Sequence, residues 1–107
     1  MKINKIKKIV IKIGSSSISS IKKGLNQSNI NILVNEIDWL KKHGVKVVLV
    51  SSGAISLGLH VSGKQNRPTK LAQLQSLAAI GQIELMQAYK KFFHKNNKDI
   101  QIGQVLL

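Results

Sequence analysis

The stretch from residue 45 to residue 56 limits what this chain can fold into more than any other part of the sequence. It begins with Val-Lys-Val-Val-Leu-Val, bounded upstream by Gly44, and changes at once to the small residues Ser-Ser-Gly-Ala at positions 51–54. A short, dense β-branched run is typical of a strand buried on both faces of a parallel sheet. The residues that follow position 54 indicate a helix.

A strand that passes through small residues into a helix places free backbone N–H groups at the carboxyl end of a sheet. Open α/β sheets bind their ligands at that edge, and helix N-termini favour anions. The turn at residues 51–54 is therefore a candidate ligand-binding segment. A tight turn that needs small residues only for packing explains the same pattern equally well.

A second candidate lies at Lys12, near the carboxyl end of an apolar strand predicted at residues 8–13 and followed by Gly14 and three serines. A buried ammonium group is costly unless it is paired, so this side chain must reach solvent or meet an anion. One interpretation is a lysine that extends its charged end into water. The other is a charge aimed at phosphate, beside a Gly-Ser loop whose amides face the same anion. The spacing of a Walker A loop is absent.

Hydrophobic periodicity predicts alternating strands and helices along the rest of the chain. The predicted elements are a strand at 8–13, a loop at 17–28, a helix at 29–43 capped by Ser28 or Asn29, a strand at 45–50, a short helix to residue 59, a loop at 61–69, a helix at 70–94 capped by Thr69, and a strand at 100–107. Gly81 lies in the middle of the long helix, at a cost of ~1 kcal/mol relative to alanine. We expect a close approach of another backbone to offset that cost.

This order of elements implies a parallel sheet with helical crossovers in a layered α/β fold. The sequence ends on a hydrophobic strand, and a three-stranded parallel sheet leaves edges and one face poorly protected. We therefore expect residues 1–107 to be the amino-terminal part of a larger domain. We expect a partial layered α/β fold with the first three strands and their helices, and the family resemblance given below implies the three-layer α/β/α form of it.

The composition excludes several classes of protein. Cysteine is absent, which excludes disulfides, thiolate metal sites and cysteine nucleophiles. The longest uncharged run, residues 47–63, is rich in Ser and Gly and shorter than the ~20 apolar residues of a membrane span. The basic start lacks a cleavage site of small residues. We expect a soluble, cytoplasmic protein that does not contact a membrane.

The formal net charge of +13 raises the question of nucleic-acid binding. Arg67 is the only arginine among the 17 basic residues, whereas recognition of base edges and phosphates favours arginine. The few aromatic residues mostly fall at helical core spacing, where they cannot stack on bases. The four acidic residues form no credible metal site or acid–base pair. These features argue against nucleic acid and against a resident metal.

Four local motifs resemble the amino acid kinase family, and within it the glutamate kinases. They are Val-Ile-Lys-Ile-Gly-Ser-Ser at 10–16, Ser-Ser-Gly-Ala-Ile at 51–55, Ala-Ala-Ile-Gly-Gln at 78–82 and Ile-Gly-Gln-Val-Leu-Leu at 102–107. The first is shared loosely across the family, whereas the second and third are more specific to glutamate kinases. Ser15 and Ser51 stand where threonine is usual, and each keeps the hydroxyl. The resemblance runs along essentially the whole chain.

The resemblance implies transfer of the γ-phosphate of ATP to the side-chain carboxylate of L-glutamate, the first step of proline biosynthesis. Lys12 would be the catalytic contact to the transferring phosphate, with Gly14 and Ser15 beside it at the nucleotide, and Mg²⁺ would neutralise the remaining charge of ATP. Ser52, Gly53 and Ala54 would line the glutamate site. A homo-oligomer of the family's type is compatible with this resemblance.

The family's nucleotide-binding segments, its substrate-binding Asp and Asn, a second phosphate-facing lysine and the accessory RNA-type domain all lie beyond residue 107. Two functional classes therefore stay open: a kinase that works only when a second chain supplies the carboxyl-terminal half, and a fragment that is inactive by itself. Within the family, a uridylate or acetylglutamate kinase is a competing interpretation. The Ser-Gly-Ala-Ile turn argues against it, because those relatives usually have Gly-Gly there. Outside the family, the competing interpretation is a non-catalytic basic fragment that binds nucleic acid.

Overall fold

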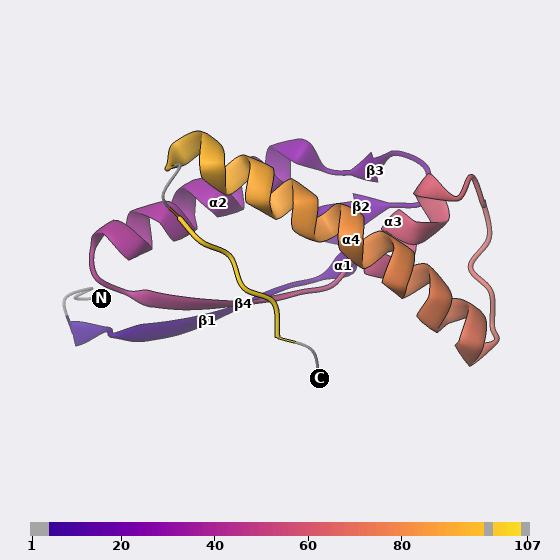
Figure 1. Cartoon of the computed structure of the whole chain (residues 1–107), viewed down its shortest axis with the longest axis horizontal. Helices are drawn as coiled ribbons and strands as arrows, with labels where there is room; N and C mark the ends of the chain where they lie inside the picture. Colours follow the sequence, from indigo (N-terminus) through magenta and orange to yellow (C-terminus); the bar gives the residue numbers. More distant parts are fainter. Residues whose placement is uncertain (1–4, 98–99, 106–107) are drawn as a thin grey trace.

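Two parallel strands, β1 (Lys8–Ile13) and β4 (Lys46–Ser51), lie side by side in the computed structural model, which describes residues 5–97 and 100–105 (Figure 1). Their register runs without a break from Lys8 opposite Lys46 to Ile13 opposite Ser51. The two strands therefore begin and end level with each other. This confirms the α/β class with a parallel sheet, and β1 has the predicted bounds.

Helices and a second, smaller sheet accompany this pair. In chain order they are α1 (Ser15–Ile18), β2 (Ser19–Ser20), β3 (Gly24–Leu25), α2 (Gln27–Lys42), α3 (Ala54–Val61) and α4 (Leu71–Asn96). Strands β2 and β3 form a small antiparallel hairpin of their own. Among the described residues, no helix combines the length and the apolar character that crossing a membrane requires.

The long helices match their predicted positions closely, but their caps differ. Helix α2 begins two residues earlier than predicted because its N-cap is Asn26, whose side chain accepts a hydrogen bond from the Asn29 N–H at 3.0 Å. Gly44 follows α2 with φ of 80°, as expected of a glycine that ends a helix. Helix α4 begins after Lys70, without a side-chain cap, so the predicted cap at Thr69 is wrong.

The predicted loop at residues 17–28 is wrong, because this segment holds the end of α1, the β2–β3 hairpin and the start of α2. The Asn26 N–H donates to the Ile18 carbonyl at 2.7 Å and closes the hairpin. Gly24 adopts φ of 75° after the turn. Each strand has only two residues, so the hairpin produces no periodic pattern in the sequence.

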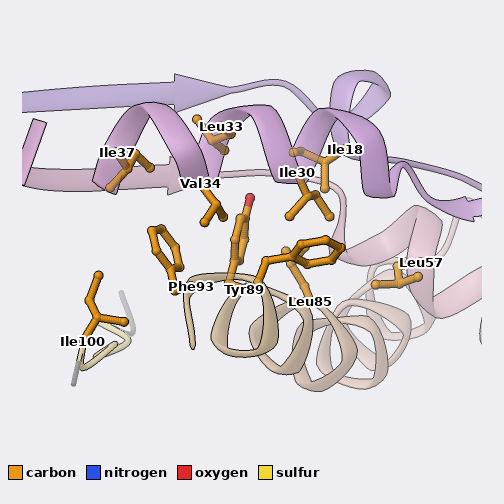
Figure 2. Packing of buried hydrophobic residues seen from close by; sticks show 11 residues of the cluster. Ile18, Ile30, Leu33, Val34, Ile37, Leu57, Leu85, Tyr89, Phe93 and Ile100 are labelled. Carbon is orange, nitrogen blue, oxygen red and sulfur yellow. The ribbon is translucent and has the colours of Figure 1, made fainter. Parts of the chain in front are cut away.

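The core lies between one face of the sheet and the two long helices, as Figure 2 shows. Helices α2 and α4 each bury an apolar stripe, and Ile18 and Leu57 extend the same cluster towards the carboxyl ends of the strands. The inward-facing strand residues that pack against it are Ile11, Ile13, Val47 and Leu49. This alternation along the strands places every second side chain of β1 and β4 on the opposite face.

That opposite face is not covered by any described residue. Val10, Val48 and Val50 are 61%, 50% and 45% exposed there, and Lys12 shares this face by alternation with Val10. The prediction that residues 45–50 are buried on both sides is therefore wrong for the described chain. The described residues supply two layers of the expected three.

The predicted third strand does not form over residues 100–105, and its last two residues lie outside the described ones. Ile100 is buried in the core cluster. Its backbone N–H and carbonyl form hydrogen bonds with residues close to it in the sequence. Its N–H donates to the Asn97 carbonyl at 3.2 Å, and its carbonyl accepts from His94 Nε2 at 3.1 Å. These two bonds tie Ile100 to the end of α4, and residues 100–105 form no strand.

Helices α3 and α4 pack backbone against backbone through two glycines. A Cβ added to Gly81 would collide with the Ala54 carbonyl, and one added to Gly58 would collide with the Leu77 carbonyl. This is the close approach that the glycine in the middle of the long helix predicted, and the prediction is confirmed. The contact fixes the first turn of α3, which follows the Ser-Ser-Gly turn directly.

We predict that Gly81→Ala lowers the free energy of unfolding by roughly 1–3 kcal/mol, because the steric conflict outweighs the higher helix propensity of alanine. Urea unfolding followed by circular dichroism measures it. Gly103→Ala is the matched control, since a Cβ there meets no atom within 4 Å. Equal stability of the two variants would contradict the close packing.

A second prediction compares the two faces of β4 with the same substitution. Val47→Thr places a hydroxyl in the core and should destabilise the chain by about 1–3 kcal/mol, whereas Val48→Thr on the open face should change stability by less than about 0.5 kcal/mol. Val48→Thr should also reduce concentration-dependent association, since exposed apolar sheet faces promote it. Urea unfolding and sedimentation velocity give both quantities, and equal costs would refute the assignment of faces.

Candidate functional site

The carboxyl ends of β1 and β4 bring the two predicted half-sites together. Ile13 and Ser51 are register partners, so the segments that begin at Gly14 and at Ser52 leave the sheet at the same edge. The Ser52 N–H donates to the Ile13 carbonyl at 3.1 Å and extends the pairing by one step. This is the edge at which open parallel sheets hold ligands.

On the β1 side, the predicted residues are open to solvent. Lys12 is exposed on the uncovered face, so its charged group reaches water. Gly14 precedes α1 with an ordinary extended backbone (φ −73°, ψ 157°), and a Cβ added there would meet no atom within 4 Å. Position 14 therefore needs a glycine neither for its backbone conformation nor to avoid a clash with the described residues. Ser15, the first residue of α1, is also exposed.

On the β4 side, the turn has a conformation that only glycine adopts readily. Gly53 is buried and has φ of 107°, in the left-handed region. It is the N-cap of α3 and offers no side chain to bond the first amides of the helix, which have no intrahelical partner in any α-helix. Ser52 is exposed and Ala54 half-buried. Polar N–H groups are thus available beside a small side chain.

Two buried hydroxyl groups, those of Ser19 and Tyr89, support this turn through hydrogen bonds, and the sequence analysis did not identify them. Ser19 Oγ donates to the Gly53 carbonyl at 2.9 Å. Ser51 Oγ lies 2.7 Å from the Tyr89 hydroxyl and donates to the Ser52 carbonyl at 3.2 Å. The Ser51 and Tyr89 hydroxyls thus share one short hydrogen bond. Figure 2 shows the Tyr89 oxygen pointing away from α4.

Tyr89 could have been suspected as an amphipathic residue on an apolar helical face, since a buried Tyr hydroxyl usually finds a partner. Burial raises the pKa of the Tyr89 phenol, and the hydrogen bond with Ser51 acts in the opposite direction. Burial prevails, so the phenol stays protonated where an exposed tyrosine begins to ionise.

We predict that Tyr89→Phe costs roughly 0.5–1.5 kcal/mol at pH 8, through the lost hydrogen bond, and changes the pH dependence. With its folded-state pKa raised above 10.0, Tyr89 retains its proton while the unfolded chain releases it. Wild-type stability should therefore fall as pH rises above about 10, and the variant should lose less. Urea unfolding of both proteins between pH 8 and 11 measures the difference between their free energies of unfolding. Both proteins contain the same lysines, so the titration of lysine cancels in this difference. Parallel curves for the two proteins would contradict this assignment.

Two surface pockets lie beside the β2–β3 hairpin, and neither includes the predicted site residues. The first, of about 340 Å³, is lined by residues of α1, the hairpin and the start of α2. The second, of about 480 Å³, is lined by Ile21, Lys22, His60, Gly63, Lys64 and Gln65. In the part of the chain that the structure describes, no group of three or more His, Cys, Asp or Glu residues could hold a metal. The predicted site residues lie on an open edge of the sheet, outside both pockets.

Comparison with known proteins assigns the chain to a family. The model of the amino acid kinase family matches residues 7–107. The chain belongs to the amino acid kinase family.

Among curated proteins, the chain is similar to glutamate 5-kinases. It is 42% identical to the glutamate 5-kinase of Lactococcus lactis subsp. lactis over 102 residues, which is 95% of this chain and 37% of that protein. It is 43% identical to the Alkaliphilus metalliredigens protein over 105 residues, or 98% of this chain and 39% of that protein. For the Marinomonas protein the identity is 40% over 106 residues, or 99% and 28%. The chain thus spans between about a quarter and two-fifths of these relatives, in their amino-terminal part.

Proposed function

We propose that this chain forms the acceptor-binding and phosphate-facing part of a kinase that phosphorylates the side-chain carboxylate of L-glutamate with ATP, as in the first step of proline biosynthesis. The main support is the register of β1 and β4, whose strands end at the same level. As a result, residues 12–15 and 52–54 lie at one edge of the sheet. The similarity to proteins named glutamate 5-kinase supports the choice of acceptor.

Each side of the edge has a distinct role in this proposal. Lys12 contacts the transferring phosphoryl group as a cation, and the open backbone at Gly14 and Ser15 lets phosphate oxygens approach the amides. Ser52, Gly53 and Ala54 bind glutamate through the serine hydroxyl and the free N–H groups that open α3. Phosphoryl transfer depends mostly on positioning and on neutralising charge, which suits one lysine and a set of amides.

In this proposal Mg²⁺ accompanies ATP and is held mainly by groups outside the described residues of this chain. Mg²⁺ coordinates oxygen ligands, commonly carboxylates and substrate phosphates, and no cluster of candidate ligands exists among the described residues. Bound Mg²⁺ neutralises phosphate charge, and its protein ligands in this proposal come from a complementing part. The nucleotide-binding groups come from the same part, so the chain alone is expected to be inactive.

The test is a hybrid that joins this chain to the part of the Lactococcus lactis relative beyond the matched region. We expect ATP-dependent formation of glutamyl phosphate, trapped as the hydroxamate, by the hybrid and not by the chain alone. Absence of activity from a folded hybrid would contradict the proposed function. Activity of the chain alone, above that of Lys12→Ala, would contradict the need for a complementing part.

In the hybrid, two variants should affect different kinetic constants. Lys12→Ala should mainly lower kcat, because the cation meets negative charge that grows towards the transition state. Ser52→Ala should mainly raise the KM for glutamate. Loss of one hydrogen bond to a charged group costs roughly 1.5–3 kcal/mol, or about ten- to hundredfold.

Steady-state kinetics with each substrate varied separately decides the assignment. Ser56→Ala, one turn into α3, is the matched control for Ser52→Ala and should change the KM for glutamate by less than about threefold. If Ser52→Ala changes only the KM for ATP, the turn after β4 does not bind the acceptor.

A further inference from the structure

The segment that follows β1 is tied at both ends to the turn that follows β4. At its start, the Ile13 carbonyl accepts the Ser52 N–H at 3.1 Å. At its end, Ser19 Oγ donates to the Gly53 carbonyl at 2.9 Å. The four-residue helix α1 and Gly14 lie between these two ties. Two successive residues of the turn therefore bracket the whole segment that carries Gly14 and Ser15.

The Ser19 hydroxyl is not needed to satisfy the carbonyl that it contacts. The Gly53 carbonyl already accepts the Leu57 N–H at 3.0 Å, the first hydrogen bond of α3. Ser19 is only 4% exposed, and a buried hydroxyl loses hydration that its one hydrogen bond largely offsets. An alanine would fill most of the same space. The Ser19 hydroxyl thus fixes the orientation of the Gly53 carbonyl more than it raises the free energy of unfolding.

The contact depends on the unusual backbone of the turn. A Cβ on Gly53 would lie 2.9 Å from Ser19 Oγ, so only glycine lets the hydroxyl approach. In a planar trans peptide the carbonyl and the following N–H point in opposite directions. A hydrogen bond that fixes the Gly53 carbonyl therefore also fixes the Ala54 N–H, which points away from Ser19.

We propose that Ser19 is a positioning residue that holds the Ser52–Ala54 turn in a fixed place relative to the segment after β1. This inference rests on the proposed function, in which the turn binds the acceptor and the segment faces the phosphate. Ser19 contacts neither ligand. Its hydroxyl sets the direction of the Ala54 amide and the distance between the two halves of the site, which in-line transfer requires to be constant.

The first test is amide hydrogen exchange by NMR on the whole 107-residue chain. In Ser19→Ala, the Ser52 and Leu57 amides, which bond to Ile13 and Gly53, should exchange about three- to tenfold faster. The Leu85 and Tyr89 amides in α4 should be unchanged. Ser19→Thr, which keeps the hydroxyl, should restore the slow exchange. Ser20→Ala is the matched control, because Ser20 bonds only within the hairpin, accepting the Lys23 N–H at 3.0 Å.

Unchanged exchange at Ser52 and Leu57 in Ser19→Ala would overturn the proposal. So would a uniform increase that includes α4, since that would mark a general loss of stability. Failure of Ser19→Thr to restore exchange in a chain of wild-type stability would also overturn it, because the hydroxyl would then not be the active group.

The second test separates this inference from the function on which it rests. Titration of the labelled chain with L-glutamate should shift the Ser52 and Ala54 amides, and Ser19→Ala should weaken the binding about three- to tenfold while Ser20→Ala does not. Equal affinity of Ser19→Ala and wild type would overturn the positioning role. If the wild-type chain shows no shift at all, the acceptor part of the proposed function fails, and the exchange measurement still decides the role of Ser19.

Discussion

The parallel pairing of β1 with β4 is the interaction on which the rest of this structure depends. Parallel strands need a crossover between them, and the hairpin and helix α2 supply it on one face of the sheet. Because the register has no offset, both strands end at the same level. Because the strands end at the same level, the segment after β1, which begins at Gly14, lies next to the turn after β4, which begins at Ser52. The candidate site depends on this arrangement.

The edge is held by contacts beneath it as well as by the sheet. The backbone contact of Gly81 with Ala54 seats the first turn of α3 on α4. The Ser19 hydroxyl bonds to Gly53 in the turn, and the Tyr89 hydroxyl bonds to Ser51 directly before it. The exposed half of the site therefore rests on a well-packed and hydrogen-bonded support. If the proposed function holds, such a support matters, because positioning and fixed charges supply most of the rate enhancement in phosphoryl transfer.

The sequence predicted the parts of the fold that have a local signal. β1 was predicted to the residue, because its apolar run ends at a glycine, and the glycine in the middle of α4 correctly predicted a close backbone neighbour. The β2–β3 hairpin was missed because two-residue strands have no period. The third strand was predicted wrongly over residues 100–105 because an apolar run does not reveal whether a ladder partner is present.

The residues of the candidate site were predicted from the sequence, whereas the hydroxyl groups that support them were missed. Gly14 and the Ser-Ser-Gly-Ala turn stand out as small residues directly after strands, whereas Ser19 and Tyr89 do not. Their partners lie 34 and 38 residues away along the chain, and no local pattern encodes such a hydrogen bond. Only the packed α/β layers bring these groups together.

The most direct test of the account is a crystal structure of the hybrid enzyme with L-glutamate and a non-hydrolysable ATP analogue. The account predicts glutamate against the Ser52–Ala54 turn and the terminal phosphate beside Lys12 and Gly14, with both ligands at the carboxyl edge of β1 and β4. Glutamate bound away from this turn, or a terminal phosphate remote from Lys12, would contradict the central claim that this edge unites the two halves of the site.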